Sequence, residues 1–359
     1  MVTRVGVVFG GVSAEREVSL VSARTILGGL ESAGHSAVPI AIDASGCFRD
    51  DADSSAILAR GFDAVAPAAV RLPTGRFDRV DVAFPIVHGE TGEDGTLQGF
   101  FETLGIPYAG SDVASSALGM NKAAFKARMR DAGIPVVPSV AIDRHEWASG
   151  AAAAADTIAR RLPLPVFVKP SGGGSSLGVS KVKDWSALAG AIESAFAYDR
   201  TALVEEGVDG REIECAVLGN DSPEASGCGE IVPGREFYDY EDKYISGGAR
   251  LLLPAPLEPS VSERVRDIAR RAFALCGCSG FGRVDFFVGR HDGRIHVNEL
   301  NTLPGFTAIS MYPKLWEHAG LPLPRLLDRI VHLAGERWSA QGRDRAARSA
   351  PLKIAPRPS

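Results

Sequence analysis

Residues 5–11 read VGVVFGG, an unbroken apolar run that ends at two glycines. An apolar run of this length followed by turn residues predicts a buried β-strand that enters a tight turn. Apolar side chains then recur at helical spacing over residues 18–30, and two further apolar runs follow at residues 37–42 and 80–87. This order of strand, helix and strand predicts an α/β fold with a parallel N-terminal sheet, which binds ligands at the carboxyl ends of its strands.

The rest of the chain alternates further helices and strands. We expect helices at residues 115–132, 151–161, 260–275 and 324–334, and strands at residues 166–169, 202–205, 212–218, 283–288 and 295–299. Residues 43–78 show no regular element. Residues 336–359 are rich in Arg and Pro and lack apolar periodicity, which predicts a mobile tail.

Composition narrows the class of protein. The chain has 359 residues, 45% hydrophobic and 23% charged, which suits two or three packed domains. A net charge of −5 argues against a nucleic-acid partner, and no apolar run is long enough to span a membrane. The run at residues 5–9 is too short for a signal-peptide core. The five cysteines are scattered without CxxC spacing, so we expect a cytoplasmic protein with free thiols.

The clearest chemical signal is a set of oxygen ligands on two neighbouring strands. The sequence NELN at residues 298–301 places Glu299 and Asn301 two apart on a strand, so their side chains share a face. Asp285 lies on the preceding strand, and a hairpin would bring the two strands together. Two carboxylates and an amide oxygen without His or Cys suit Mg²⁺. Ordinary acidic residues at strand ends explain this triplet about equally well when it is taken alone.

A glycine-rich segment follows another strand. Lys169 ends an apolar run, and residues 170–178 read PSGGGSSLG. Small residues allow backbone N–H groups to approach a phosphate, and the lysine supplies charge. The chain has no GxxxxGK[ST] and no GxGxxG after its first strand, so a Walker A loop and a dinucleotide site there are unsupported. A flexible connection is the alternative for the glycine run, and a solvated charge is the alternative for Lys122.

Other charged residues carry weaker signals. Glu205 and Glu206 flank a strand end, and an exposed sheet edge explains Glu206 and Glu214 well. Glu15 lies near a helix N-terminus, where the helix dipole alone favours an acid. His88 lies at the carboxyl end of the third strand, where ligands bind in such sheets.

Taken together and in order, these segments resemble the D-alanine–D-alanine ligases of the ATP-grasp superfamily. The resemblance runs from about residue 5 to residue 334. The matching blocks are GGVSAEREVS at 10–19, HG at 88–89, GEDGTLQG at 92–99, VKP at 168–170, GSSLG at 174–178, FYDYEDKY at 237–244 and NELNTLPGFT at 298–307. The resemblance implies an α/β (α+β) fold of three domains, with ATP bound between the central and C-terminal domains. The expected boundaries are residues 1–113, 114–210 and 211–335, followed by a tail at 336–359.

The resemblance also implies a reaction. ATP would convert one D-alanine to D-alanyl phosphate, and the amine of a second D-alanine would displace the phosphate, giving D-alanyl-D-alanine for peptidoglycan precursors. The implied ligands of two Mg²⁺ ions, with Mn²⁺ as an alternative, are Asp285, Glu299 and Asn301. The residues implied at ATP are Lys122, Lys169 and Lys243 for the phosphates and Glu205, Glu206, Val208 and Glu212 for the adenosine.

Two further groups of residues are implied at the amino acids. Glu15 and His88 would bind the first D-alanine, Arg283 and the Gly305 N–H would face the reacting carboxyl, and Ser310 with the Met311 N–H would bind the second D-alanine. Ser175 and Tyr244 would connect to Glu15 and help to close the site.

Some alternatives stay open. The second substrate could be D-lactate or D-serine, although Tyr244 favours an amine nucleophile. A non-catalytic nucleotide-binding protein has less support because Arg283, Asp285, Glu299 and Asn301 are all present. Gly207 stands where the family often has a bulkier residue, which weakens the adenosine assignment. We expect a homodimer with D-alanine and ATP as its ligands and neither nucleic acid nor membrane as a partner.

Overall fold

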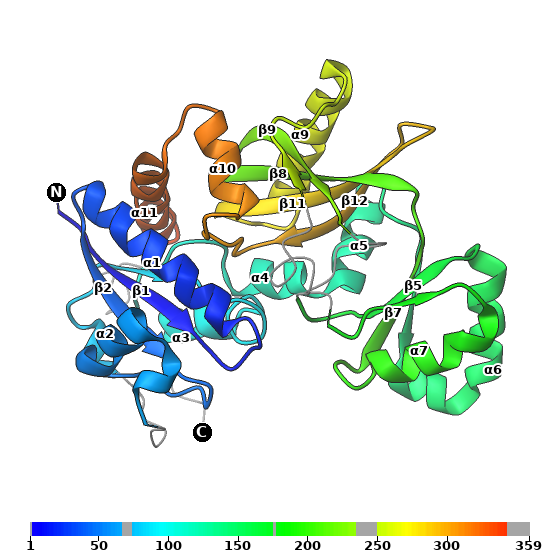
Figure 1. Cartoon of the computed structure of the whole chain (residues 1–359), viewed down its shortest axis with the longest axis horizontal. Coiled ribbons are helices and arrows are strands. Elements are labelled where there is room, and N and C mark those ends of the chain that lie inside the picture. Colours follow the sequence, from blue (N-terminus) through cyan, green and yellow to red (C-terminus); the bar gives the residue numbers. More distant parts are fainter. Residues whose placement is uncertain (1, 67–73, 175–176, 235–249, 343–359) are drawn as a thin grey trace, which may run out of the picture.

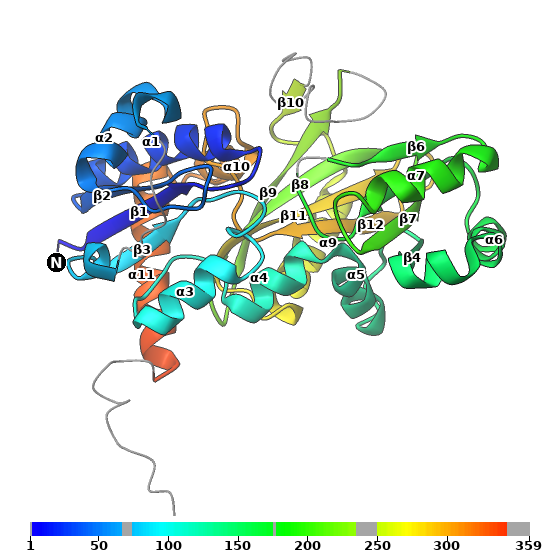
Figure 2. The same ribbon diagram turned by 90° about the horizontal axis from the view of Figure 1, so that it is seen from below.

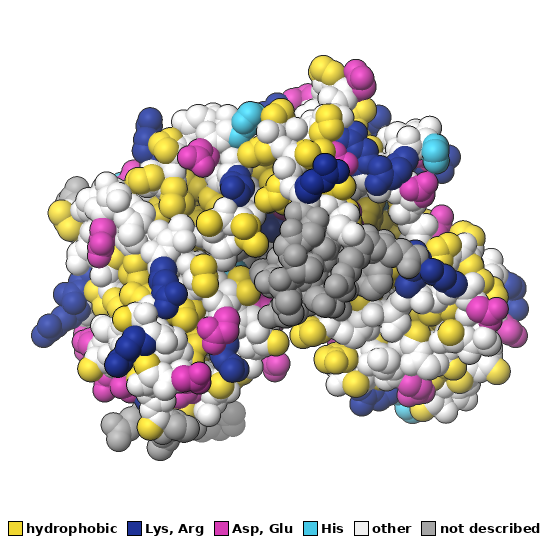
Figure 3. Space-filling model, in the orientation of Figure 1, with side chains coloured by type: hydrophobic (Ala, Val, Ile, Leu, Met, Phe, Trp, Pro, Cys, Tyr) yellow, Lys and Arg dark blue, Asp and Glu magenta, His cyan; other side chains and the backbone are white. Residues whose placement is uncertain are grey.

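The computed structural model describes residues 2–66, 74–174, 177–234 and 250–342. The predictions for Ser175, Lys243 and Tyr244 lie outside these residues. The described residues form three β-sheets, each accompanied by helices (Figure 1). The predicted α/β fold is therefore confirmed. On the face shown in Figure 3, Lys and Arg side chains of the described residues are interspersed with Asp and Glu. Within the described ranges, no helix is long and apolar enough to cross a membrane.

The N-terminal sheet is parallel, as predicted. Its strand order is β2-β1-β3, with β1 at Arg4–Gly10, β2 at Ser36–Ile42 and β3 at Val82–Pro85. Helix α1 (Arg16–Ser32) follows the turn after β1, and α3 (Thr96–Leu104) follows β3. The expectation that residues 43–78 lack regular structure is wrong, because they contain α2 (Asp51–Arg60). Asp50 caps this helix by accepting a hydrogen bond from the N–H of Asp53 at 2.8 Å.

The central sheet is antiparallel, with strand order β4-β7-β5-β6. Its strands are β4 (Ser139–Asp143), β5 (Val166–Pro170), β6 (Ser180–Val182) and β7 (Thr201–Glu206). One hydrophobic core joins the sheet to α6 (Arg144–Arg161) and α7 (Leu188–Ala195). The glycine-rich segment leaves the end of β5 beside the start of β7, and Glu205 and Glu206 lie at the other end of β7, beside the start of β5.

The C-terminal sheet is antiparallel, with strand order β10-β9-β8-β11-β12. Its strands are β8 (Gly210–Gly219), β9 (Glu224–Val232), β10 (Arg250–Leu252), β11 (Gly280–Gly289) and β12 (Ile295–Asn301). Helix α9 (Pro259–Leu275) shares a core with this sheet. A second core joins the sheet to the N-terminal sheet, and in it the rings of Phe84 and Phe281 lie 5.7 Å apart. The N-terminal and C-terminal sheets are thus held together by one shared hydrophobic core.

The helix expected at residues 115–132 is in fact two helices. Helix α4 (Val113–Met120) ends at Asn121, whose backbone is extended, and α5 (Lys122–Asp131) begins directly after it. The Asn121 side chain accepts a hydrogen bond from the N–H of Ala124 at 3.0 Å, so the residue caps α5. The break places Lys122 at the start of a helix, where its N–H donates to the carbonyl of Ser171 at 2.9 Å.

Helix α5 packs in the hydrophobic core of the C-terminal sheet and not in that of the central sheet. Phe125 and Met129 of α5 are fully buried in the core of the five-stranded C-terminal sheet. The expected boundaries of the central subdomain, residues 114–210, remain a prediction. Figure 2 shows α3, α4 and α5 following one another along one side of the molecule.

The last helix is longer than predicted. Helix α11 spans Leu323–Ala340 and packs against the N-terminal sheet, whereas the sequence predicted a mobile tail from residue 336. Arg337 and Trp338 are buried, and the Arg337 guanidinium donates to the carbonyl of Tyr108 at 2.9 Å while lying 4.2 Å from the centre of its ring. Burial of these two side chains extends the helix, so the expectation is wrong for residues 336–340.

Candidate active site

A hairpin of β11 and β12 forms one wall of the site. Asp285 pairs with Glu299 and Arg283 pairs with Asn301, so the predicted side-by-side arrangement of these strands is confirmed. Residues paired across strands and residues two apart on a strand share a face, which groups all four side chains on one surface. A register shift directly after Asp285 leaves Asn298 without a partner on β11. Bulges of this kind re-aim neighbouring side chains and are frequent beside active sites.

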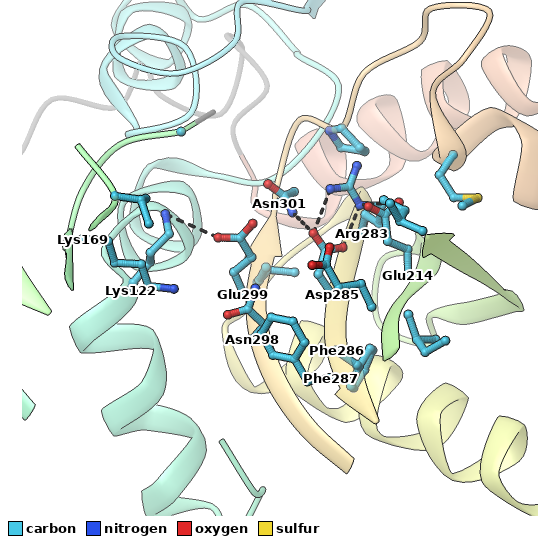
Figure 4. Close-up of a pocket in the computed structure, with 18 of the residues that line it drawn as sticks. Lys122, Lys169, Glu214, Arg283, Asp285, Phe286, Phe287, Asn298, Glu299 and Asn301 are labelled. Atoms are coloured by element: carbon cyan, nitrogen blue, oxygen red, sulfur yellow. Dashed lines mark hydrogen bonds and ion pairs between the residues drawn. The ribbon is translucent and has the colours of Figure 1, made fainter. Parts of the chain in front are cut away.

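Hydrogen bonds organise the polar groups of the hairpin (Figure 4). Arg283 donates from Nε and Nη2 to the two oxygens of Asp285, at 2.7 and 2.8 Å. Asn301 donates from Nδ2 to Oδ2 of the same carboxylate at 2.8 Å. Asp285 is therefore held from two sides.

A third strand contributes Glu214. It pairs with Asp285 across β8 and β11, and its Oε2 lies 3.1 Å from Nε of Arg283. We expected Glu214 on an exposed sheet edge, which is wrong, because the residue is buried. Burial disfavours the charge of Arg283, but attraction to Asp285 and Glu214 outweighs burial and holds its pKa well above the ordinary value. Arg283 is thus a fixed cation in the wall of the site.

The donor set of the hairpin fits a hard cation. Asp285 and Glu299 present carboxylate oxygens, and the side-chain amide of Asn301 lies against Asp285. Within the described ranges, no three or more His, Cys, Asp and Glu side chains converge as a metal cluster. Mg²⁺ characteristically uses one or two protein carboxylates and completes its shell with water and substrate phosphates. These residues therefore suit a cation that arrives with a phosphorylated ligand.

Two lysines face the hairpin from across the site (Figure 4). Nζ of Lys122 donates to the carbonyl of Gly173 at 2.7 Å and lies 3.5 Å from Oε2 of Glu299. Nζ of Lys169 lies 2.7 Å from Oε2 of Glu205. A solvated charge was the alternative for Lys122, but its side chain is only 13% exposed. Both ammonium groups are held by protein oxygens at the edge of the site.

The glycine-rich loop also meets the N-terminal part of the chain. A Cβ on Gly174 would lie 2.9 Å from Oε2 of Glu15, and one on Gly89 would lie 3.2 Å from the same oxygen. Glycine at both positions therefore allows close approach to this carboxylate. His88 precedes Gly89 and is buried. Burial lowers its pKa, while the nearby Glu15 opposes that shift.

The segment that follows β12 forms the remaining wall of the site. The Phe306 N–H donates to Oγ of Ser22 at 3.2 Å, and the Thr307 N–H donates to Oγ of Ser310 at 2.9 Å. A Cβ on Gly305 would lie 2.8 Å from Oγ of Ser310, so glycine brings the backbone close to that hydroxyl. Ser310 directly precedes α10 (Met311–His318). The N-terminus of this helix offers backbone N–H groups to an anion.

A single cavity of about 770 Å³ connects these walls. It is lined by every predicted site residue that the structure describes. These are Glu15, His88, Lys122, Lys169, Glu205, Glu206, Val208, Glu212, Arg283, Asp285, Glu299, Asn301, Gly305 and Ser310. Residues that follow β1 and β3 of the N-terminal sheet thus meet residues of the other two sheets in one place.

Two acid–base groups at the site were not predicted. Glu93 lines the cavity, and its Oε2 accepts a hydrogen bond from the N–H of Gly89 at 2.7 Å. Burial, together with repulsion from Glu15, raises the pKa of Glu93 to about 8. Lys126 lies behind the cavity with its Nζ 2.9 Å from Oε1 of Glu205. The sequence gives only a partial signal for Lys126, which lies three residues before the buried Met129 and so on the same side of α5.

Comparisons with known proteins find relatives over most of the chain. The chain matches the families described as D-ala D-ala ligase N-terminus over residues 4–111 and D-ala D-ala ligase C-terminus over residues 128–332. It is 47% identical to the D-alanine–D-alanine ligase of Sodalis glossinidius, over 92% of this chain and 94% of that protein. It is 43% identical to D-alanine–D-alanine ligase A of Escherichia coli strain K12, over 94% and 97%.

Solved structures of two ligases have the same fold as this chain. The D-alanine–D-alanine ligase from Coxiella burnetii superposes with a TM-score of 0.82 at 37% identity, covering 95% of this chain and 96% of that one. The VanG D-Ala:D-Ser ligase from Enterococcus faecalis also superposes with a TM-score of 0.82, at 36% identity, covering 93% and 100%.

Proposed function

The chain belongs to the D-alanine–D-alanine ligase family, and from this premise we propose that it joins two D-alanine molecules at the expense of ATP. The observation that carries the proposal is the single cavity in which the β11–β12 hairpin, two lysines and Glu15 meet. Separate regions of this cavity suit a nucleotide phosphate chain, a reacting carboxyl and an amino-acid ammonium group.

The first step is phosphorylation of one D-alanine. A carboxylate is a poor acceptor for an amine because oxide is a very poor leaving group, whereas an acyl phosphate releases phosphate. Asp285, Glu299 and Asn301 would hold Mg²⁺, two ions in our proposal, which neutralises phosphate charge when bound. Lys122 and Lys169 would contact the phosphates from the opposite wall. Outside the described residues, Lys243 is proposed for the same task.

The adenosine would occupy the end of the cavity beside β7. Glu205, Glu206, Val208 and Glu212 line this end, and Phe167 adds an aromatic surface. Gly207 has no side chain to fill the space there, but a Cβ on it would lie 2.7 Å from the carbonyl of Pro165. The absence of a bulkier residue is therefore explained by this close approach to the backbone.

The second step is attack by the amine of the second D-alanine. Negative charge develops on the carbonyl oxygen, and donors must already be in place. Arg283, fixed by Asp285 and Glu214, and the N–H of Gly305 would serve as these donors; one such donor is typically worth about 3–4 kcal/mol. Ser310 and the Met311 N–H would bind the carboxylate of the attacking D-alanine.

The first D-alanine would lie beside the N-terminal sheet. Glu15 would pair with its ammonium group, with His88 adjacent. Burial lowers the pKa of His88 and so favours its neutral form, which adds no competing positive charge. Ser175 and Tyr244, outside the described residues, are proposed to connect to Glu15 and to help exclude water, since an acyl phosphate would hydrolyse in open solvent.

The second substrate needs a direct test, because one structural neighbour is named a D-Ala:D-Ser ligase. Phosphate release and product mass should be measured with ATP plus D-alanine alone, D-alanine with D-serine, and D-alanine with D-lactate. We expect the dipeptide of D-alanine to dominate. A larger yield of the D-serine or D-lactate product would overturn this choice, and phosphate release that ignores all three acids would overturn ligase activity. We also propose a homodimer, which sedimentation velocity of the purified chain would test.

A further inference from the structure

We propose that Lys126, which does not line the cavity, is a positioning residue that fixes Glu205 and through it places Lys169 at the nucleotide end of the site. The inference rests on the proposed use of ATP. It concerns a residue on α5 that lies behind the wall formed by β5 and β7.

The side chains of Lys126, Glu205 and Lys169 form two ion pairs that share the carboxylate of Glu205. Nζ of Lys126 lies 2.9 Å from Oε1 of Glu205, and Nζ of Lys169 lies 2.7 Å from Oε2 of the same carboxylate. Each carboxylate oxygen of Glu205 thus pairs with a different lysine. Lys126 is 0% exposed and Glu205 is 4% exposed, whereas Lys169 reaches the cavity. One lysine anchors the carboxylate from inside the protein, and the carboxylate anchors the lysine that faces the ligand.

Stability alone does not account for Lys126. A fully buried ammonium loses its hydration, and an apolar side chain of similar volume at such a position is often neutral or more stable. Burial lowers the pKa of Lys126 to about 8, with Glu205 opposing that shift and Lys169 adding to it. The effect of burying Lys126 is to stabilise the charged form of Glu205. The pKa of Glu205 is lowered despite burial because both lysines attract its charge.

The arrangement predicts what happens when Lys126 is removed. Without its inner partner, Glu205 either shares both oxygens with Lys169 or takes up a proton. In the first case Lys169 is drawn back from the cavity, and in the second case it loses its anchor. Either change weakens contact with a nucleotide, whereas the groups proposed for the two D-alanines, such as Glu15 and Ser310, are left in place. The effect should therefore appear in ATP binding and not in the KM for D-alanine.

The experiment compares four full-length proteins: wild type, Lys126→Met, Glu205→Gln and the double variant. The dissociation constant for ATP with Mg²⁺ is measured by calorimetry without D-alanine, and the KM for D-alanine is measured at saturating ATP. Lys126→Met should weaken ATP binding by about tenfold, the size of one lost charge-assisted contact of roughly 1.4 kcal/mol. The KM for D-alanine should stay within about twofold. Lys183→Met, an exposed lysine after β6, is the matched control and should change neither value.

The decisive comparison is between Glu205→Gln and the double variant. If Lys126 acts only through Glu205, its removal should matter little once Glu205 is neutral, so these two proteins should bind ATP within about twofold of each other. Additive losses, or an unchanged ATP affinity in Lys126→Met, would overturn the proposal. This comparison also holds if Lys126→Met fails to fold, since the double variant leaves neither the Lys126 ammonium nor the Glu205 carboxylate buried without its partner.

The readout separates this inference from the proposed function. ATP binding is measured without the amino acid, so a wild-type protein that binds ATP but makes no dipeptide would contradict the ligase proposal and leave the Lys126 comparison intact. A wild-type protein that does not bind ATP would contradict both.

Discussion

Arg283 and Asp285 lie two residues apart on β11 and form a two-pronged ion pair, with Nε and Nη2 of the guanidinium 2.7 and 2.8 Å from the two carboxylate oxygens. The proposed donor to the reacting carboxyl is therefore oriented by a proposed metal ligand. This shared contact links the two steps of the reaction, because any change that moves Asp285 also moves the positive charge that the tetrahedral intermediate requires.

Arg283→Lys tests whether this orientation matters beyond charge. Lysine keeps the positive charge but presents a point donor, so it cannot hold both oxygens of Asp285 in one plane. We expect kcat for dipeptide formation to fall by roughly 100-fold, the effect of losing one preorganised oxyanion donor. The dissociation constant for ATP should change little, because the lysines proposed at the phosphates remain. Turnover within about threefold of wild type would remove Arg283 from the proposed role.

Glu299→Gln tests the hairpin as a metal site. Glutamine keeps the shape of the side chain but removes the charge that Mg²⁺ prefers, and it also removes the negative partner of Lys122. Product formation should be abolished at ordinary Mg²⁺ concentration, while the circular dichroism spectrum stays that of the wild type. Asp267→Asn on the exposed face of α9 is the control and should leave turnover unchanged. Near-normal turnover of Glu299→Gln would refute the metal assignment.

The sequence predicted the hairpin well because strand geometry is simple. The two-residue period fixes which side chains share a face, so Glu299 and Asn301 could be grouped without knowledge of the fold. The N-terminal parallel sheet followed in the same way from apolar runs and turn residues. The roles of Ser175, Lys243 and Tyr244 remain predictions.

The predictions that were wrong missed either a local break in a helix or packing against residues far away in the sequence. Asn121 breaks one apparent helix into α4 and α5 by adopting an extended backbone and capping the second helix, and apolar periodicity does not record such a break. Burial of Lys126 depends on Glu205, which lies far away in the sequence, and a lysine on a helix is ordinarily solvated. Trp338 is buried against the N-terminal core, which no pattern within residues 336–340 indicates.

Gly174→Ala tests the approach of the glycine-rich loop to Glu15. The added Cβ would lie 2.9 Å from Oε2 of Glu15, which is the end of a flexible side chain and can move without disturbing the fold. The KM for the first D-alanine should therefore rise by about tenfold, equivalent to roughly 1.4 kcal/mol of binding. Thermal stability should stay close to that of the wild type.

The matched control for this change is Gly190→Ala on α7. A Cβ at that position meets no atom within 4 Å, and alanine favours a helix over glycine, so stability should rise slightly and the KM should not change. If Gly174→Ala binds D-alanine as well as Gly190→Ala does, the contact between the loop and Glu15 has no bearing on the substrate.

Glu93→Gln tests the buried acid beside Glu15. Its pKa is raised to about 8, so at neutral pH the folded protein keeps a proton that the unfolded chain has released. The contribution of Glu93 to the free energy of unfolding of the wild type is fully present below the ordinary glutamate pKa. It falls as the pH rises towards 8 and is constant above that pH. Glutamine does not titrate and can still accept the hydrogen bond from Gly89 through its amide oxygen.

The melting temperature of Glu93→Gln relative to wild type should therefore increase from pH 5 to pH 8 and then level off. D-Alanine should reduce this difference at pH 8, because its ammonium group would favour the ionised carboxylate and so stabilise the wild type specifically. A difference that is constant from pH 5 to pH 9 would show that Glu93 is ionised in the folded protein throughout this range. In that case Glu15 and Glu93 would present two negative charges to the ammonium group, and the first D-alanine would be bound between them.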